Sequence, residues 1–166
     1  MPKGLKKTSE TVQISFTKGE DAANTFSQKQ VDLQLDVLNR EVFVVTCVDF
    51  DLKPPDAIAG TSTVSQCSLS TTTRTSVGNL GDSNVIAAQR DDCGLGAAYT
   101  SSENPSAAVG SMLEYIGIIA TNDFFVQIKG DSNNNASFVH GRLYGYRAVA
   151  NADIFAALTQ SEILSG

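Results

Sequence analysis

The segment that decides the fold is Gln30–Asp56, QVDLQLDVLNREVFVVTCVDFDLKPPD. Its first part, Val31–Val37, alternates apolar and polar residues, a period of two that is typical of a half-buried β-strand. Its second part, Val42–Val48, is apolar on both alternating faces, which indicates a strand covered on both sides, in a sandwich core or at a subunit contact. The pair Pro54–Pro55 ends this strand, because proline cannot donate a hydrogen bond to a neighbouring strand. The segment therefore predicts a β-rich protein.

Much of the remaining chain repeats the alternating pattern. It predicts further strands over Thr11–Thr17, Thr61–Thr75, Val85–Ala88, Met112–Ala120, Asp123–Lys129 and Ser137–Val149. The strand over 61–75 is rich in threonine and serine, so we expect it near a sheet edge or a water-rich contact. Only Thr121 and Asn122 separate the strands over 112–120 and 123–129, which suggests a hairpin.

Helical periodicity occurs only near the C-terminal end. Asn151 is a suitable N-cap, and an apolar stripe follows it at helical spacing, formed by Ile154, Phe155, Leu158 and Ile163. Together these patterns predict an all-β fold: a two-sheet antiparallel sandwich, with a jelly roll as the favoured topology, and a short C-terminal α-helix.

The chain divides into three expected parts. These are a flexible N-terminal arm over residues 1–10, a β-sandwich domain over 11–150, and a helix over 151–166 that packs on the domain or on a neighbouring copy. The stretch Asp91–Gly110 is irregular and long, and we expect a contact loop there. The predicted core, buried within or between subunits, consists of Val31, Leu33, Leu35, Val42, Val44, Val48, Ile116, Ile118, Phe124, Val126, Ile128 and Leu143.

The composition favours a protein that contacts other protein surfaces. Of 166 residues, 18% are charged, against about a quarter in an average soluble domain. The formal net charge of −6 argues against nucleic acid as the main partner, because such binding needs a cationic surface. The exception is Lys3, Lys6 and Lys7, which belong either to a solvated terminus or to a short arm that touches an acidic lumen or a neighbouring subunit. Any nucleic-acid contact should be limited to this arm.

The sequence lacks the patterns of a membrane span and of catalysis. No run of about 18 apolar residues and no secretory signal occur, so we expect a soluble protein. His140 is the only histidine and has no accompanying nucleophile signature, so we predict no enzyme and no catalytic residue. Cys47, Cys67 and Cys93 are odd in number and lack the spacing of metal ligands, so we predict no metal and no cofactor. Cys47 should be buried, and Cys93 should lie in an exposed loop.

Two acidic groups were weighed as cation sites. Asp131–Asn135 resembles the start of a calcium loop, but Ala136 replaces the required glycine and Arg142 replaces the bidentate glutamate, so a hairpin turn explains these residues better. Asp49, Asp51 and Asp56 form a second group. They either bind a cation at a subunit contact or remain solvated at the end of a strand.

A stripe on the strand over 137–149 is the main candidate for binding. Arg142, Tyr144 and Tyr146 alternate along it and share one face with Phe138 and His140. Such a stripe is typical of contact hot spots, and it could also stack sugar or single-stranded nucleic acid. A third interpretation is a strand whose tyrosines are half buried with their hydroxyls at the rim.

The strand succession from Val31 to Val149 resembles the single jelly-roll capsid proteins of icosahedral, tailless viruses. The resemblance implies a sandwich whose loops and edges build a shell in the virion, from copies of itself, with other virion proteins as further candidate partners, and it brings no active site. The predicted function is therefore a self-assembling capsid subunit, with Phe155, Leu158 and the stripe as candidate contacts. The alternative is a β-sandwich module, soluble in the cytoplasm, that binds carbohydrate or another ligand through Arg142, Tyr144 and Tyr146.

Overall fold

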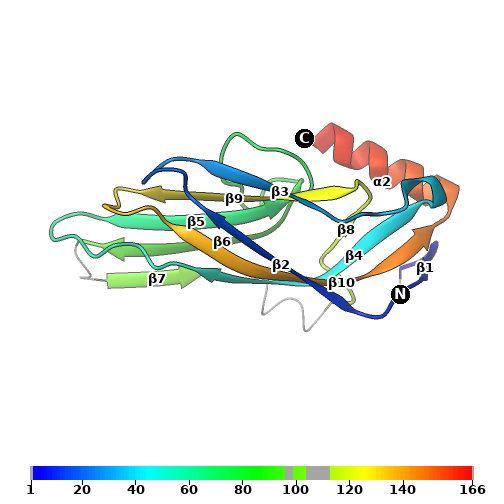
Figure 1. Ribbon diagram of the computed structural model, residues 1–166, viewed down its shortest axis with the longest axis horizontal. Coiled ribbons are helices and arrows are strands. Elements are labelled where there is room, and N and C mark those ends of the chain that lie inside the picture. Colours follow the sequence, from blue (N-terminus) through cyan, green and yellow to red (C-terminus); the bar gives the residue numbers. More distant parts are fainter. Residues whose placement is uncertain (1, 96–98, 104–112, 166) are drawn as a thin grey trace.

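The computed structural model describes residues 2–95, 99–103 and 113–165, and Figure 1 shows them as a layered β-structure with one long helix. The elements, in chain order, are β1 (Leu5–Lys7), β2 (Val12–Gly19), β3 (Ser27–Asp32), the 3-10 helix η1 (Val37–Asn39), β4 (Glu41–Leu52), β5 (Thr63–Ser70), β6 (Val85–Gly94), β7 (Tyr99–Glu103), β8 (Gly117–Ile119), β9 (Asp123–Asp131), β10 (Phe138–Ala150) and α2 (Ala152–Ser165).

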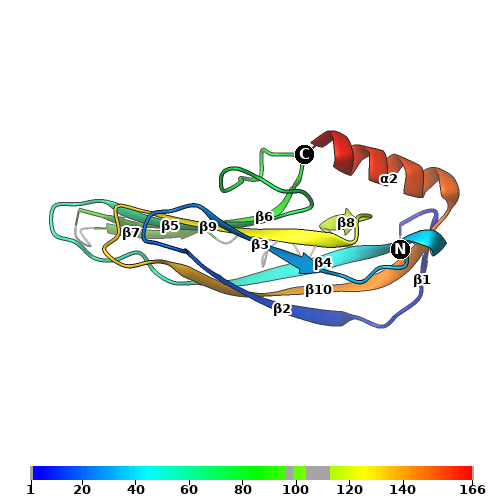
Figure 2. The ribbon, with the colours of Figure 1, turned by 45° about the horizontal axis from the view of Figure 1, so that its top comes forward.

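The strands form two antiparallel sheets that lie face to face (Figures 1 and 2). Sheet A has the order β1-β10-β4-β8, with β2 also paired to β10, and sheet B has the order β3-β9-β5-β6-β7. The strands β1 and β2 pair with opposite halves of β10, at Ala148–Ala150 and Phe138–Gly145 respectively.

The pairing identifies the sandwich as a jelly roll. When β2, β3, β4, β5, β6, β8, β9 and β10 are counted in order, the first pairs with the eighth, the second with the seventh, the third with the sixth and the fourth with the fifth. A long hairpin that rolls up on itself produces this nested order, and its two halves join where β10 meets β4 and β9 meets β5. Eight such strands in two sheets make a jelly roll, to which this chain adds β1, β7 and α2. The predicted fold class is confirmed.

Both faces of β4 are buried, as the sequence predicted. On the inner face, Phe43, Val45 and Val48 belong to the core between the two sheets. On the opposite face, Val42 and Val44 belong to a second apolar cluster, against which α2 packs through Ile154, Phe155 and Leu158. A β-bulge at Thr46, where the register with β10 shifts, adjusts the alternation between the two halves of the strand. The segment Val42–Val45 is thus covered on both faces within one chain, whereas Asp49 and Asp51 in the second half of the strand are exposed.

The chain leaves sheet B earlier than the alternation over Val31–Val37 predicted. The strand β3 ends at Asp32, although Leu33 and Leu35 remain buried in the core. Their backbone groups bond to single groups of other elements: the amide of Leu33 donates to the carbonyl of Asn122, and the guanidinium of Arg147 donates to the carbonyl of Leu33. At Leu33 and Leu35 the alternation of apolar and polar residues therefore reflects burial of every second side chain and not pairing in a strand.

Two predicted strand positions were wrong. β5 lies in the middle of sheet B, between β9 and β6, and not at an edge, because its buried serines bond to other strands: Ser68 donates to Gln127 of β9 at 2.6 Å. The strands β8 and β9 do not form a hairpin, because β8 pairs with β4 in sheet A and β9 lies in sheet B. The connection, which has three residues (120–122), therefore crosses between the sheets.

Two segments expected to be irregular contain strands. Within the N-terminal arm, Leu5–Lys7 forms β1 on the edge of β10, and Leu5 is buried under α2. Within Asp91–Gly110, the first four residues extend β6 and Tyr99–Glu103 forms β7, while the other parts of this stretch include 96–98 and 104–110, which lie outside the described residues.

Candidate functional site

The structure separates the predicted binding stripe of β10 into an exposed part and a buried part. Arg142 is exposed and Tyr144 is half-buried, whereas Tyr146 is only 9% exposed and lies in the cluster beneath α2. The ammonium of Lys7 lies 5.1 Å from the centre of the Tyr146 ring. Burial raises the pKa of the Tyr146 hydroxyl. Tyr146 is therefore a packing residue, and a stacking platform of two tyrosines does not exist.

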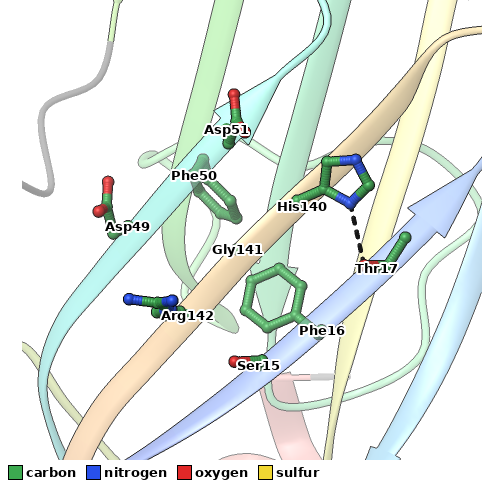
Figure 3. Close-up of a pocket in the computed structure, with 9 residues that line it drawn as sticks. All are labelled: Ser15, Phe16, Thr17, Asp49, Phe50, Asp51, His140, Gly141 and Arg142. Atoms are coloured by element: carbon green, nitrogen blue, oxygen red, sulfur yellow. Dashed lines mark hydrogen bonds between the residues drawn. The ribbon is translucent and has the colours of Figure 1, made fainter.

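A polar depression of about 350 Å³ lies at the other half of the stripe (Figure 3). Three adjacent strands form it in register: His140 of β10 stands between Thr17 of β2 and Asp51 of β4, and Arg142 stands between Ser15 and Asp49. These residues contribute two carboxylates, one guanidinium, one imidazole and two hydroxyls, which suits an uncharged polar ligand or one with mixed charges.

The row Thr17–His140–Asp51 has the residue types of a catalytic triad but not its contacts. Nδ1 of His140 lies 3.0 Å from Oγ1 of Thr17. In a triad, the carboxylate holds the base by a hydrogen bond to its other ring nitrogen. Within the described part of the chain no bond joins Asp51 to His140, and the His140 ring is exposed and packs against Phe138, with 5.0 Å between ring centres. The row is a cross-strand ladder of polar side chains on a sheet surface.

The three aspartates weighed as a cation site do not come together. Asp49 and Asp51 flank the depression, whereas Asp56 accepts hydrogen bonds from the backbone amides of Asn134 and Asn135. These bonds, with Lys53 nearby, lower the pKa of Asp56. Across residues 2–95, 99–103 and 113–165, no cluster of three or more histidine, cysteine, aspartate or glutamate side chains could hold a metal.

The predicted N-terminal lysines lie at the β1 edge of sheet A. Lys3 and Lys6 are exposed. Lys7 contacts the Tyr146 ring and pairs with Glu10 at 3.8 Å. Lys7 is also exposed, but its ammonium is already engaged by the Tyr146 ring and Glu10.

Helix α2 covers the sheet with one face and exposes apolar side chains elsewhere. Phe155 and Leu158 are partly buried against the chain's own β-structure. Asn151 caps the helix, because its side-chain oxygen accepts the amide of Ile154 at 2.8 Å. Ile163 and Leu164 are 67% and 75% exposed. A second depression, also of about 350 Å³, follows one flank of the helix and is lined by Phe155, Ala156, Thr159, Gln160, Ile163 and Leu164.

The turn that holds η1 is a feature that sequence reasoning missed. Leu38 is 96% exposed and Val37 is 45% exposed. The alternation over Val31–Val37 predicts that Val37 lies in a strand, and it predicts nothing for Leu38. The break in alternation at the adjacent pair Val37–Leu38 is the signal that could have revealed an exposed apolar turn.

The three cysteines are unpaired and structural. Cys67 is fully buried in the core, and its burial strongly raises the pKa of the thiol. Cys93 is also buried, within β6, so its predicted exposure was wrong. Cys47 is half-buried, and burial together with Asp49 raises its pKa. A raised pKa disfavours the thiolate, which is the reactive form.

Comparisons with known proteins add no argument to the strand pairing. No protein-family model matches this sequence, and no curated protein matches it. Among solved structures, a chain of Desmodium yellow mottle tymovirus is similar over 92% of this chain and 95% of its own, with 8% sequence identity and a TM-score of 0.34. A likeness at this TM-score carries no argument, so the fold assignment rests on the strand pairing. That pairing is the nested order of a jelly roll, the fold class expected from the sequence. Among the described residues, no helix has the length and apolar content that crossing a membrane requires.

Proposed function

We propose that this chain is a structural virion protein, a self-assembling capsid subunit without catalytic activity. The observation that carries the proposal is apolar surface left over on a sandwich whose own core is already covered. Leu38, Ile163 and Leu164 are all more than half exposed, although α2 and both sheets are packed. Such surface on a chain with few charges favours burial against another protein surface.

The fold and the resemblance support the same proposal. The edge strands of the described sheets are β1, β2 and β8 in sheet A and β3 and β7 in sheet B. Exposed edges and loops are the parts through which the jelly-roll capsid proteins that this chain resembles build shells. The partners would be other copies of this chain, with other virion proteins as further candidates, and the location would be the virion.

The absence of catalysis is supported by the chemistry of the described residues. The imidazole of His140 bonds to Thr17 and lacks a supporting carboxylate contact among them, and the thiols of Cys67 and Cys93 are buried. Nucleophilic catalysis needs an accessible nucleophile and an oriented base. A shell subunit needs neither.

The depression around His140 and Arg142 favours a second candidate function. It supports a binding module for carbohydrate, since carboxylates and guanidinium groups bond well to sugar hydroxyls. The contribution of Tyr146 to such a site is lost, because that ring is buried. The remaining candidates are Arg142 with Asp49, Asp51 and Tyr144.

Measurement of mass in solution separates the two candidates. Size-exclusion chromatography with light scattering, followed by negative-stain microscopy, should show closed particles of many copies for a capsid subunit. The binding module predicts a monomer at high micromolar concentration, whose Arg142→Ala variant loses affinity for a sugar array.

A further inference from the structure

The turn Asp36–Glu41 is a rigid support for η1. The Asp36 side chain accepts the amide of Asn39 at 3.3 Å, and Arg40 ends the turn in the left-handed region, with φ of 58°. The amide of Ala150 in β10 donates to the carbonyl of Arg40, and Arg147 of the same strand pairs with Glu41 at 3.0 Å. The turn is thus fastened to sheet A at both its backbone and its side chains.

This rigid turn presents apolar side chains to solvent. Val37 and Leu38 project from it, and Leu38 is 96% exposed. A single exposed leucine is common on protein surfaces. Val37 and Leu38 are adjacent on a turn that many hydrogen bonds hold in place. Such a protrusion loses little conformational entropy when a partner covers it, which favours binding. Beside them, the exposed guanidinium of Arg40 makes no hydrogen bond or ion pair within residues 2–95, 99–103 and 113–165.

The flank of α2 has the complementary properties. Its depression of about 350 Å³ is lined mainly by apolar atoms of Phe155, Ala156, Ile163 and Leu164, and none of its lining residues is charged. The helix carries no basic residue, and its exposed acidic residue is Asp153, one turn before Ala156, whereas Glu162 is buried against the sandwich. A partner that brings apolar side chains and a positive charge would match it in both respects, and the η1 turn brings both.

We propose that one copy of this chain docks its η1 turn into the α2 flank of the next copy, with Leu38 as the inserted side chain. This inference rests on the proposed self-assembly and adds which surfaces meet. The turn lies at the end of the sandwich where α2 begins, whereas the flank extends toward the C-terminal end of the helix, so the two cannot meet within one chain (Figures 1 and 2). Because each copy has one of each, the contact is head-to-tail, and it builds rings or larger shells where the rotation between neighbours closes and filaments where it does not.

Disulfide trapping between two copies tests this contact directly. One chain carries Leu38→Cys, and a second chain, with a tag that changes its size on a gel, carries Gln160→Cys at the exposed rim of the flank. Under mild oxidation of the mixture we expect a mixed dimer of the two chains, at least tenfold more abundant than either dimer of identical chains. Leu95→Cys replaces Leu38→Cys in the matched control, because Leu95 is 59% exposed and lies outside both surfaces.

The outcomes separate the contact from the assembly. Disulfides formed by the native cysteines are detected in a control mixture of each variant with the wild-type chain. If the wild-type chain forms particles but Leu38→Cys traps only with itself, or no better than Leu95→Cys does, the contact is wrong while the proposed function stands. If the wild-type chain stays monomeric and no mixed dimer forms, both fail. A dominant mixed dimer, together with loss of particles in Leu38→Asp, supports the contact.

Discussion

The carboxylate of Glu162, in the last turns of α2, accepts a hydrogen bond from the backbone amide of Ala120 at 2.6 Å, directly after β8. The amide of Thr121 donates to the same carboxylate at 3.0 Å. Glu162 is buried, so this contact fastens the helix to the connection that crosses from sheet A to sheet B. It also places an ionisable group where water is excluded.

The buried position of Glu162 makes stability depend on pH. Burial raises the pKa of this carboxyl, against the opposing effect of the two amides. A folded-state pKa above the unfolded value means that the group contributes most below the unfolded pKa, and that this contribution is lost as pH rises through the folded pKa. We expect urea unfolding from pH 4 to 8 to show wild type losing stability relative to Glu162→Gln as the pH increases. A difference that stays constant over this range would contradict this role of Glu162.

Gly145 of β10 is required by close packing. A Cβ atom there would lie 2.2 Å from the carbonyl oxygen of Val44 and 2.5 Å from the ring of Phe43. We expect Gly145→Ala to lower the free energy of unfolding by about 3 kcal/mol, measured by chemical denaturation. Gly19→Ala is the matched control, because its nearest atom would be 3.8 Å away. Equal losses of stability in the two variants would show that the space around Gly145 is not as tight as described.

Arg147 should stabilise the segment between β3 and β4. Its guanidinium donates to the carbonyls of Leu33 and Gln34 and pairs with Glu41 at 3.0 Å. Replacement by methionine leaves these acceptors without donors, so we expect a loss of about 2 kcal/mol, seen as a lower urea midpoint. Arg142→Met, on the same strand but exposed, should change stability by less than about 0.5 kcal/mol.

His140 should be dispensable for both folding and chemistry. Its imidazole is exposed and its partner Thr17 is itself a surface residue, so His140→Ala should leave the melting temperature nearly unchanged. Any hydrolytic activity in the wild-type protein that disappears in this variant would overturn the proposal of a non-catalytic subunit. A panel of ester, peptide and glycoside substrates provides the measurement.

The sequence predicted what depends on local pattern. The alternation around β4 revealed both of its buried faces, and Asn151 marked the start of α2, because burial and capping leave signatures within a few residues. Pairing partners leave no such signature. The short connection at Thr121 and Asn122 looks the same in a hairpin as in a crossing between sheets, and the buried Ser68 is explained only by Gln127, 59 residues away.

The candidate site was predicted in composition but not in layout. Arg142, Tyr144 and Tyr146 do share a face, yet the fold of β1 and α2 over one end of that face decides that Tyr146 is buried and Arg142 exposed. The alternation within β10 contains no sign of either covering element, so it could not predict that Tyr146 is buried. The exposed Leu38 was missed for a related reason, since its exposure follows from a turn whose bonds come from Arg147 and Ala150.

The measurement that tests the central claim most directly is the particle mass of the wild-type chain. Light scattering coupled to size-exclusion chromatography at modest salt, with negative-stain images of the same fractions, should give closed particles of uniform size. Leu38→Asp should shift that mass toward the monomer, while far-ultraviolet circular dichroism retains the β-sheet spectrum. A wild-type chain that remains strictly monomeric at high micromolar concentration, with neither rings nor shells in the images, would contradict the account.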